Sequence, residues 1–477
     1  MTGIKAPGSS PARIVAAIHS RHGMAMVRSR WGGIPRGNAP AGKFFRTETI
    51  SGVWWLIDPD GGRFLSKGVN TVRYDQDAVQ NSDRIPYAEA CRRKYGSEDA
   101  WRAAAAARLL SWGFNTLGSW SDMRVANAGP SPLAATPTLH LGSAFASRSS
   151  NAAPQAFPDV FDPAFERHVA QRAHDLCAPW CEDQHIIGWF SDNELRWGPD
   201  WRGDDALLTL FLNLPPQSPG RRASLELLRE RYGSFADFNT VWRSSLGGWD
   251  ELAASPHIAP PCPQQPTCKR DATTDAQISS SDPKHAAFLA DCDLFAGRIA
   301  HRYFSTVSAA VRKADPNHLF LGCRFAYAPS SSVIDAAKPH LDILSFNNYD
   351  PDVAAVIDSY AATGKPCMVT EFSFRGDDSG LPNTIGAGLR VPRQTDRARC
   401  FRSFVESGLR HPHLVGYHWF EPAAPPAEGR FGGENSNYGA VTIEDVAYEE
   451  LTRTMTDVNA RAETIHAGAA APGWAAK

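Results

Sequence analysis

One pattern recurs along the chain and limits how it can fold: a short apolar, β-prone run ends in polar or aromatic residues and is followed by a helix-like stretch. Two of these runs lead to a glutamate, Glu194 after 186–191 and Glu371 after 365–370. The apolar residues bury such a strand, whereas a carboxylate at its tip must meet polar surroundings, because leaving it buried and unpaired has a high free-energy cost. The pattern therefore predicts two carboxylates held on a rigid scaffold.

Eight candidate strands alternate with helix-like stretches in this way. Their approximate ranges are 64–70, 114–120, 138–143, 186–194, 319–324, 344–349, 368–371 and 415–420. The simplest fold of the α/β class with this order is a (β/α)8 barrel, also called a TIM barrel, whose functional groups lie at the C-terminal ends of the strands.

The domain organisation follows from where this alternation starts, pauses and stops. Residues 1–45 are rich in Gly, Pro, Arg and Ser and are expected to form a flexible N-terminal arm. The barrel is expected over 46–460, with a helical and loop insertion after the fourth strand at about 198–283. Residues 461–477 are expected to be a C-terminal tail.

The charge balance argues against two classes of partner. Lysine and arginine number 49 against 51 acidic residues, for a net charge of -2. Nucleic acid and membrane surfaces both require a concentrated basic face, so we expect neither as a partner. No stretch reaches the roughly 18 apolar residues of a membrane span. The sequence leaves the oligomeric state open.

The nine cysteines are scattered and do not form a disulfide framework, although Cys177/Cys181 and Cys262/Cys268 could each close a small loop. No second ligand pair at zinc spacing accompanies Cys177 and Cys181, so no metal and no cofactor are expected. The first forty residues lack a convincing secretory segment, which favours a cytoplasmic location. A start at Met24 or Met26 would leave a periplasmic or secreted protein open.

Paired carboxylates at strand ends suit the cleavage of a glycosidic bond. One carboxyl group protonates the leaving oxygen, and the other either attacks the anomeric carbon or activates water. The first arrangement retains the anomeric configuration and needs the groups about 5–5.5 Å apart, whereas inversion needs roughly 6.5–9.5 Å. Glu194 and Glu371 are the candidates for this pair.

Several motifs carry a resemblance to a known group of proteins. They are NTVRYD (70–75), NTLGSW (115–120), GWFSDNELRWG (188–198), LFLGCRF (319–325), VTEFSF (369–374), HWF (418–420) and GENSNYG (433–439). In these motifs and their order the chain resembles the retaining (β/α)8-barrel glycoside hydrolases, most closely the exo-acting β-agarases. The stretch RYGSFADFNTVW (231–242) is similar to one found more distantly in microbial β-galactosidases.

The resemblance implies a role for each strand-end residue. Glu194 would be the acid/base and Glu371 the nucleophile. Asn193 would bind the sugar 2-hydroxyl, Tyr349 would donate to Glu371, and Trp419 would form the hydrophobic floor under the sugar.

Further residues are placed by the resemblance around the same sugar. Those expected to line the site are Asn70, Arg73, Trp120, Arg324, Asn348 and His418, and Glu434 and Asn437 are expected to bind a neighbouring sugar. For Arg73 and Arg324 an ion pair that only holds the barrel top together is almost as well supported. Trp120 and Trp197 fit packing roles equally well.

The function implied is that of a retaining exo-β-glycosidase. It would hydrolyse β-galactosidic linkages in agarose-type or related galactose-containing oligosaccharides by double displacement, with the oligosaccharide as its binding partner. A β-galactosidase, another β-glycosidase acting on glucosides or mannosides, a transglycosylase and a non-catalytic carbohydrate-binding barrel remain alternatives.

Overall fold

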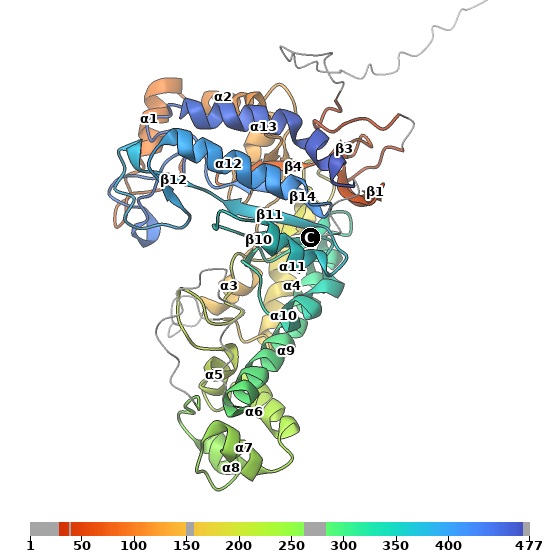
Figure 1. The fold of residues 1–477 in the computed structure, drawn as a ribbon, viewed down its shortest axis with the longest axis vertical. Coiled ribbons are helices and arrows are strands. Elements are labelled where there is room, and N and C mark those ends of the chain that lie inside the picture. Colours follow the sequence, from red (N-terminus) through yellow and green to blue (C-terminus); the bar gives the residue numbers. More distant parts are fainter. Residues whose placement is uncertain (1–27, 38–39, 149–156, 262–282, 471–477) are drawn as a thin grey trace, which may run out of the picture.

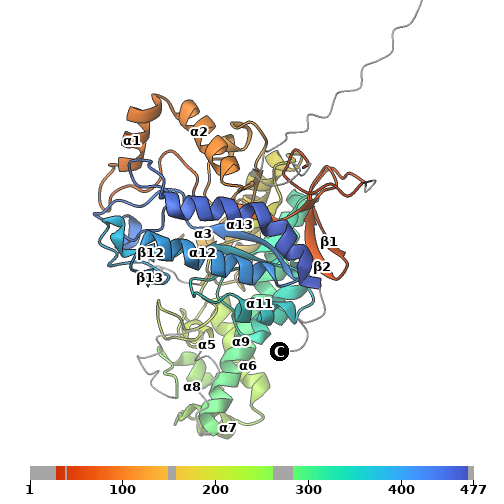
Figure 2. The same cartoon turned by 45° about the horizontal axis from the view of Figure 1, so that its top comes forward.

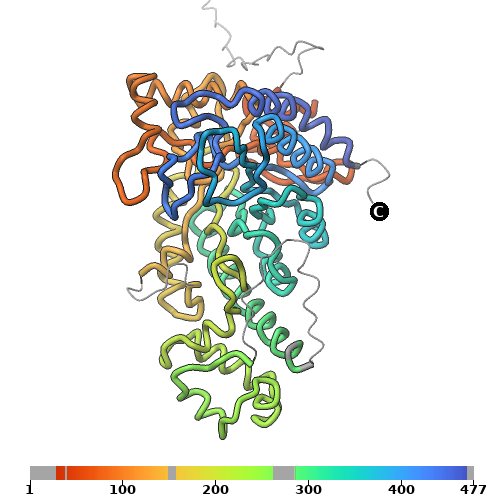
Figure 3. The backbone as a smooth tube through the Cα atoms, turned by 60° about the vertical axis from the view of Figure 1, so that its left-hand side comes forward, coloured from red at the N-terminus to blue at the C-terminus, as the bar shows by residue number. Residues whose placement is uncertain are grey.

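Parallel strands and covering helices make up one part of the molecule, and a lobe of short helices makes up the other (Figure 1). The computed structural model describes residues 28–37, 40–148, 157–261 and 283–470. The lobe lies at the far end of one long helix, α9 (Pro283–Ala314). The tube view in Figure 3 shows the same separation from another side.

Seven strands form the main sheet, in the order β6-β5-β4-β14-β11-β10-β9. Their bounds are β4 (Ser66–Val69), β5 (Thr116–Leu117), β6 (Ala134–Ala135), β9 (Phe325–Ala326), β10 (Leu344–Asn347), β11 (Cys367–Phe372) and β14 (Leu414–Trp419). Every pair in it is parallel. Parallel pairing requires crossover connections, which is why helices separate the strands in the sequence.

Two further strands, β7 (Gly188–Phe190) and β8 (Leu319–Gly322), pair in parallel as a small second sheet. Parallel bridges from Ala135 to Ile186 and from Thr138 to Phe190 connect the β6 region to β7. On the other side, Asp342 N donates to Phe320 O at 3.0 Å and so connects β8 to the start of β10. The predicted α/β class with parallel strands is therefore confirmed.

The predicted third strand is misplaced. The sequence suggested 138–143, but the ladder forms at β6, and Leu141 begins the short helix α3 (Leu141–Ala146). The Asp192 carboxylate accepts the backbone N–H groups of Gly142 and Ser143 at 2.7 and 2.9 Å. This pairing satisfies the helix's first donors and draws residues 141–146 out of the extended conformation.

Helices cover the strands on their outer side. Those outside the lobe, besides α3 and α9, are α1 (Pro86–Tyr95), α2 (Glu98–Ser111), α4 (Pro163–Cys177), α10 (Ser331–Ala337), α11 (Ala354–Ala361), α12 (Gln394–Leu409) and α13 (Glu449–Ala467). As predicted, α4 opens with Asp162 as its cap, since the side chain accepts from Ala164 N, and Pro163 follows. Figure 2 shows α12 and α13 side by side over the sheet.

The lobe between β7 and α9 contains α5 (Leu207–Leu212), α6 (Pro219–Arg231), α7 (Phe235–Trp242) and α8 (Trp249–Ala254). These helices fall where the sequence predicted an interruption of the alternation. The buried Asp291 on α9 accepts from Tyr232 Oη at 2.5 Å and from Trp242 Nε1 at 3.1 Å. These bonds tie the lobe to the long helix.

An antiparallel sheet precedes the parallel strands, formed by β1 (Arg46–Ile50), β2 (Val53–Ile57) and β3 (Arg63–Phe64). Trp31 and Phe45, inside the predicted arm, are buried at 3% and 2% exposure and pack in one cluster with Leu321 and Met368. The described part of the predicted arm is therefore packed against the parallel strands. A last pair, β12 (Arg375–Gly376) and β13 (Arg390–Val391), lies between β11 and α12.

Two expectations concern the described residues as a whole. Within the described ranges, no helix combines the length and apolarity of a bilayer span. The seven cysteines described there are free thiols, Cys177 and Cys181 included, whereas Cys262 and Cys268 lie outside the described residues.

Candidate active site

The two predicted carboxylates meet at a single amide. Asn347, the last residue of β10, donates from Nδ2 to Glu194 Oε1 at 2.8 Å and to Glu371 Oε2 at 3.1 Å. Since one nitrogen contacts both, these oxygens are no more than about 6 Å apart. Glu371 stands beside Asn347 in the register of β10 and β11.

Arg324 connects the end of β11 to the residues that follow β7. Its side chain is fully buried, and its Nη2 lies 3.3 Å from Glu371 Oε1 and 2.9 Å from Thr370 O. Its Nη1 donates to Asn193 Oδ1 at 2.8 Å. The guanidinium carbon also lies 4.5 Å from the centre of the Trp120 ring. Arg324 therefore both orients the Asn193 amide next to Glu194 and offsets the charge of the Glu371 carboxylate.

The backbone at this point is held in an uncommon conformation. Glu194 has φ of 48° and Arg324 has φ of 50°, and the Glu194 N–H donates to Arg324 O at 3.1 Å. Residues other than glycine adopt this left-handed region at a cost of about 1–3 kcal/mol, and such strain gathers at functional sites. The residues that follow the paired strands β7 and β8 thus both adopt this strained conformation.

Burial raises the pKa of Glu371 to about 7, although Arg324 lowers it and the neighbouring Glu194 raises it again. The pKa of Glu194 is also raised, first by desolvation, with Asn347 and Arg202 acting in the opposite direction. Glu371 faces three donor groups, on Arg324, Tyr349 and Asn347. Because these donors favour its anion, we assign the proton that the pair holds near neutral pH to Glu194.

Five of the eleven predicted neighbours, Arg324 among them, are brought together here. Asn193 Oδ1 accepts from Asn347 Nδ2 at 3.1 Å in addition to Arg324. Tyr349 Oη donates to Glu371 Oε2 at 3.3 Å. Asn70 bridges two strands, since its Nδ2 donates to Thr370 O at 2.9 Å and its Oδ1 accepts from Arg324 at 3.3 Å. It is fully buried, so it supports the site from beneath.

Trp120 is a partly buried member of the site. Its Nε1–H donates to His140 Nε2 at 3.1 Å, and its ring meets the Phe420 ring edge-on at 6.5 Å. Phe420 also lies 6.5 Å from the Tyr349 ring and is only partly buried. The partly buried rings beside the carboxylates thus include Trp120, Tyr349 and Phe420.

Trp419 does not face the site, which corrects the prediction of a sugar floor. Its ring has no exposed surface and packs edge-on against Phe372 at 5.4 Å and against Phe401 of α12 at 5.7 Å. Consecutive strand residues point to opposite faces, so Trp419 faces the helices and Phe420 faces the site. Trp197 is likewise in the core, stacked on Phe304 at 5.4 Å.

Asn348 points away from the carboxylates, whereas His418 shares a strand face with Phe420 but lies deeper among the strands. Asn348 donates from Nδ2 to Asp350 O and Asp352 O, at 3.3 and 3.2 Å. His418 is fully buried between strands, with Nε2 at 2.8 Å from Ser66 Oγ. Desolvation lowers the His418 pKa to about 3, so the ring is neutral.

The three outermost predicted residues have local partners. Arg73 pairs with Asp75, two residues along the chain, with Nε to Oδ1 at 2.8 Å and Nη2 to Oδ2 at 2.6 Å. Glu434 binds Arg430 at 2.7 Å through Nη2 and remains about one-third exposed. Asn437 is fully buried and accepts from Gln394 Nε2 at 2.8 Å, so it is a structural residue.

Prediction from the sequence missed two residues of the site by one position each, because it named Asn348 in place of Asn347 and Trp419 in place of Phe420. The signal for Asn347 was available in β10, where Leu344 and Phe346 alternate with Ser345 and Asn347. Phe346 packs on Tyr360 of α11 at 4.9 Å, so the residues alternating with it face inward. An inward polar residue at a strand end is the one expected at the site.

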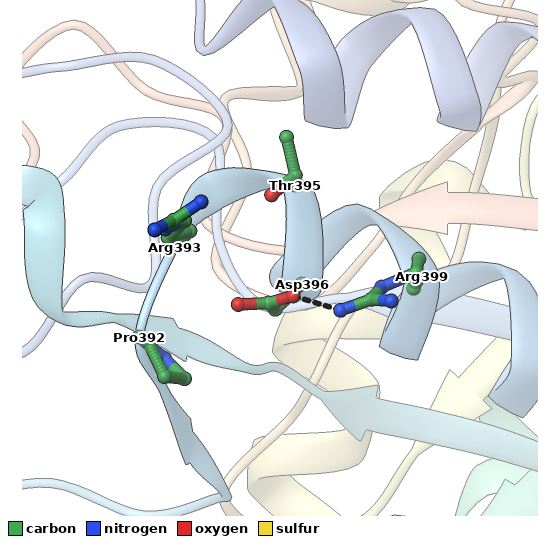
Figure 4. Close-up of a pocket in the computed structure, with 5 residues that line it drawn as sticks. All are labelled: Pro392, Arg393, Thr395, Asp396 and Arg399. Atoms are coloured by element: carbon green, nitrogen blue, oxygen red, sulfur yellow. Dashed lines mark hydrogen bonds and ion pairs between the residues drawn. The ribbon is translucent and has the colours of Figure 1, made fainter.

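A separate hollow lies at the start of α12 and is lined by Pro392, Arg393, Thr395, Asp396 and Arg399 (Figure 4). It contains none of the residues described above. Among the residues that the structure describes, no group of three or more His, Cys, Asp or Glu side chains could hold a metal ion.

Known proteins that resemble this chain match it over more than nine-tenths of its length. No protein-family model matches it. Two curated relatives from Vibrio sp. (strain JT0107) match 91% of the chain: β-agarase B at 27% identity and β-agarase A at 28%. The chain spans about half the length of these relatives, 50% and 48%.

Solved structures give the same picture. An agarase structure superimposes with a TM-score of 0.73 at 25% identity, covering 93% of this chain and 68% of the other. An exo-β-agarase structure has a TM-score of 0.75 at 23% identity, covering 92% and 68%. The second likeness concerns the fold alone. The resemblance predicted from the strand-end motifs is thereby confirmed: over most of its length this chain is similar to β-agarases.

Proposed function

We propose that this chain is a retaining exo-β-glycosidase that hydrolyses β-galactosidic linkages in agarose-type or related galactose-containing oligosaccharides. The observation that carries the proposal is the amide of Asn347, which contacts both Glu194 and Glu371. Carboxyl oxygens bridged by one amide nitrogen fit the roughly 5–5.5 Å spacing of a retaining pair better than the roughly 6.5–9.5 Å of an inverting pair.

The scaffold we propose is a (β/α)8 barrel with residues 198–283 inserted after its fourth strand. The parallel ladders and the bridges around β7 and β8 support closure, because they connect neighbouring strands in chain order. In such a barrel Glu194 and Glu371 stand at the C-terminal ends of the fourth and seventh strands.

In the first step Glu371 attacks the anomeric carbon and forms a glycosyl-enzyme, while Glu194 gives its proton to the leaving oxygen. In the second step Glu194 takes a proton from water, which attacks the same carbon and releases Glu371. Arg324 and Tyr349 keep Glu371 ionised and aimed. Desolvation keeps Glu194 protonated before the first step.

Substrate contacts follow from which groups remain available. Arg324 and Asn347 occupy Asn193 Oδ1, so the Asn193 Nδ2 group is oriented to donate to the sugar 2-hydroxyl. Phe420, in place of Trp419, offers the aromatic ring beside the sugar. The agarase homologues support an agarose-type galactoside as the substrate class.

The test replaces Glu371 with Gly and adds azide. Azide fills the space of the missing carboxylate and attacks an activated β-galactoside, so we expect an α-galactosyl azide. A β-azide would contradict the assignment of Glu371 as nucleophile. Digestion of agaro-, carrageenan-, galacto-, gluco- and manno-oligosaccharides by the unaltered chain then identifies the sugar, and cleavage of only the last two kinds would contradict galactoside specificity.

A further inference from the structure

Trp201 is a large aromatic side chain that the structure leaves 62% exposed. It lies seven positions after Glu194, in the loop that leaves the end of β7. The guanidinium carbon of Arg202 lies 4.4 Å from the centre of its ring. With the cation on one face, the exposed surface of the indole is free to contact another molecule.

The turn that presents this indole is fixed to the acid residue. Asp200 and Gly203 exchange both backbone hydrogen bonds, at 3.0 and 3.1 Å. Arg202 binds the Asp200 carboxylate through Nε and Nη2 and donates from Nη1 to the Glu194 carbonyl oxygen at 2.7 Å. The position of the Trp201 ring is therefore set by the same backbone that sets Glu194.

Another exposed indole serves as a contrast. Trp180 is 43% exposed and lies in the short 3-10 helix Ala178–Trp180, which precedes β7. It is thus at the opposite end of the strand from Glu194. Single exposed apolar residues are common on protein surfaces and need no function by themselves. What distinguishes Trp201 is its arginine link to the acid.

The proposed role of Glu194 as general acid indicates which sugar of the substrate lies nearest to it. A general acid protonates the oxygen of the departing group, so Glu194 stands on the leaving-group side of the bond. We infer that Trp201 is the platform for the departing sugar unit; this inference rests on the proposed function. A galactose ring has an apolar face of C–H groups opposite its axial hydroxyl, and this face packs on an indole as other apolar groups do.

The experiment compares two substrates with the same galactosyl group: β-galactosyl fluoride, which has no departing sugar, and a galactose-containing oligosaccharide that the unaltered chain cleaves. For Trp201→Ala we expect kcat/KM on the oligosaccharide to fall about tenfold, mainly through KM, with the loss absent on the fluoride. Trp201→Phe should recover part of it. Trp180→Ala should match the unaltered chain on both substrates.

Three results would contradict the inference: equal losses on both substrates, no loss on the oligosaccharide, or an equal loss in Trp180→Ala. Thermal unfolding of each variant excludes a general loss of fold. If the unaltered chain cleaves neither substrate, the proposed function itself fails. That outcome is distinct, because it is seen before any substitution is made.

Discussion

Two buried glutamates show how differently this molecule treats the same side chain. Glu371 at the end of β11 and Glu463 on α13 are 4% and 2% exposed. The pKa of Glu371 is raised to about 7, whereas that of Glu463 is lowered to about 2. Burial acts on both in the same direction, so burial alone does not determine ionisation.

The difference comes from the charges around each carboxylate. Glu463 binds two cations, Lys67 at 2.7 Å and Arg28 at 3.1 Å. Glu371 has Arg324 at 3.3 Å and is close to a second carboxylate, that of Glu194. The first arrangement fixes a charge for stability, and it ties the segment before β1 and strand β4 to α13. The second leaves a proton that can move.

The largest expected effect comes from removing the charge of Glu371. Glu371→Gln should lower kcat by at least about 10⁴-fold, because the proposed nucleophile is lost. The free energy of unfolding should stay the same or increase, because desolvation outweighs the donors at Glu371, as its raised pKa shows, and glutamine keeps the size of the side chain. Initial rates on a β-galactoside and denaturant unfolding measure the two quantities. A variant with a tenth of the original activity would contradict the assignment.

The opposite result is expected at Glu463. Glu463→Ala should lower the free energy of unfolding by about 3–5 kcal/mol, because Lys67 is left buried without its partner. Activity per folded molecule should not change. Glu450→Ala, at an exposed position on the same helix, is the matched control for unfolding. Equal stability of the two variants would show that the pair contributes nothing.

The same pair predicts a pH dependence of stability. Because the folded-state pKa of Glu463 is depressed to about 2, its contribution is complete above the unfolded value near 4.5 and is lost as the pH falls toward 2. Unfolding measured from pH 6 to pH 3 should therefore show a steeper loss for the unaltered chain than for Glu463→Gln. Parallel curves would contradict the depressed pKa.

A smaller effect is expected from the amide between the carboxylates. Asn347→Ala should lower kcat/KM by about 10²-fold, the size of a lost charge-assisted hydrogen bond at each carboxylate. The side chain of the neighbouring Asn348 donates to Asp350 O and Asp352 O instead, so Asn348→Ala should change kcat/KM less than about threefold. If the two variants lose activity equally, the hydrogen bonds of Asn347 to the two carboxylates do not contribute to kcat/KM.

The smallest expected change is a shift in the pH profile. Arg324 lowers the pKa of Glu371, so Arg324→Gln should raise that pKa and move the acidic limb of kcat/KM to higher pH. The direction follows because Glu371 must be ionised to attack. If the acidic limb stays in place or moves to lower pH, Arg324 does not lower the pKa of Glu371.

The sequence predicted Glu194, Glu371, Tyr349 and Arg324 because a polar residue that follows a buried apolar strand lies at the C-terminal edge of a parallel sheet. It did not decide between adjacent residues. Trp419 and Phe420 are both aromatic, and Asn347 and Asn348 are identical in type, so composition gives no preference. A shift of one residue exchanges the two faces of a strand, and only the packing of Trp419 on Phe401 settles which face is which.

Arg73 shows a different limit. Its partner Asp75 is two residues away, and such a local pair competes with any more distant contact. The third strand was misplaced for a related reason, since the carboxylate of Asp192, far along the chain, initiates a helix at Leu141. The contact of Asp192 with residues 142–143 forms only when the chain folds, so the local sequence does not reveal it.

The central claim, double displacement at Glu194 and Glu371, is tested most directly by the configuration of the first product. Proton NMR during early hydrolysis of a β-galactoside should show the β-anomer first, with the α-anomer appearing later by mutarotation. If the α-anomer appears first, the enzyme inverts and the two carboxylates do not work as described.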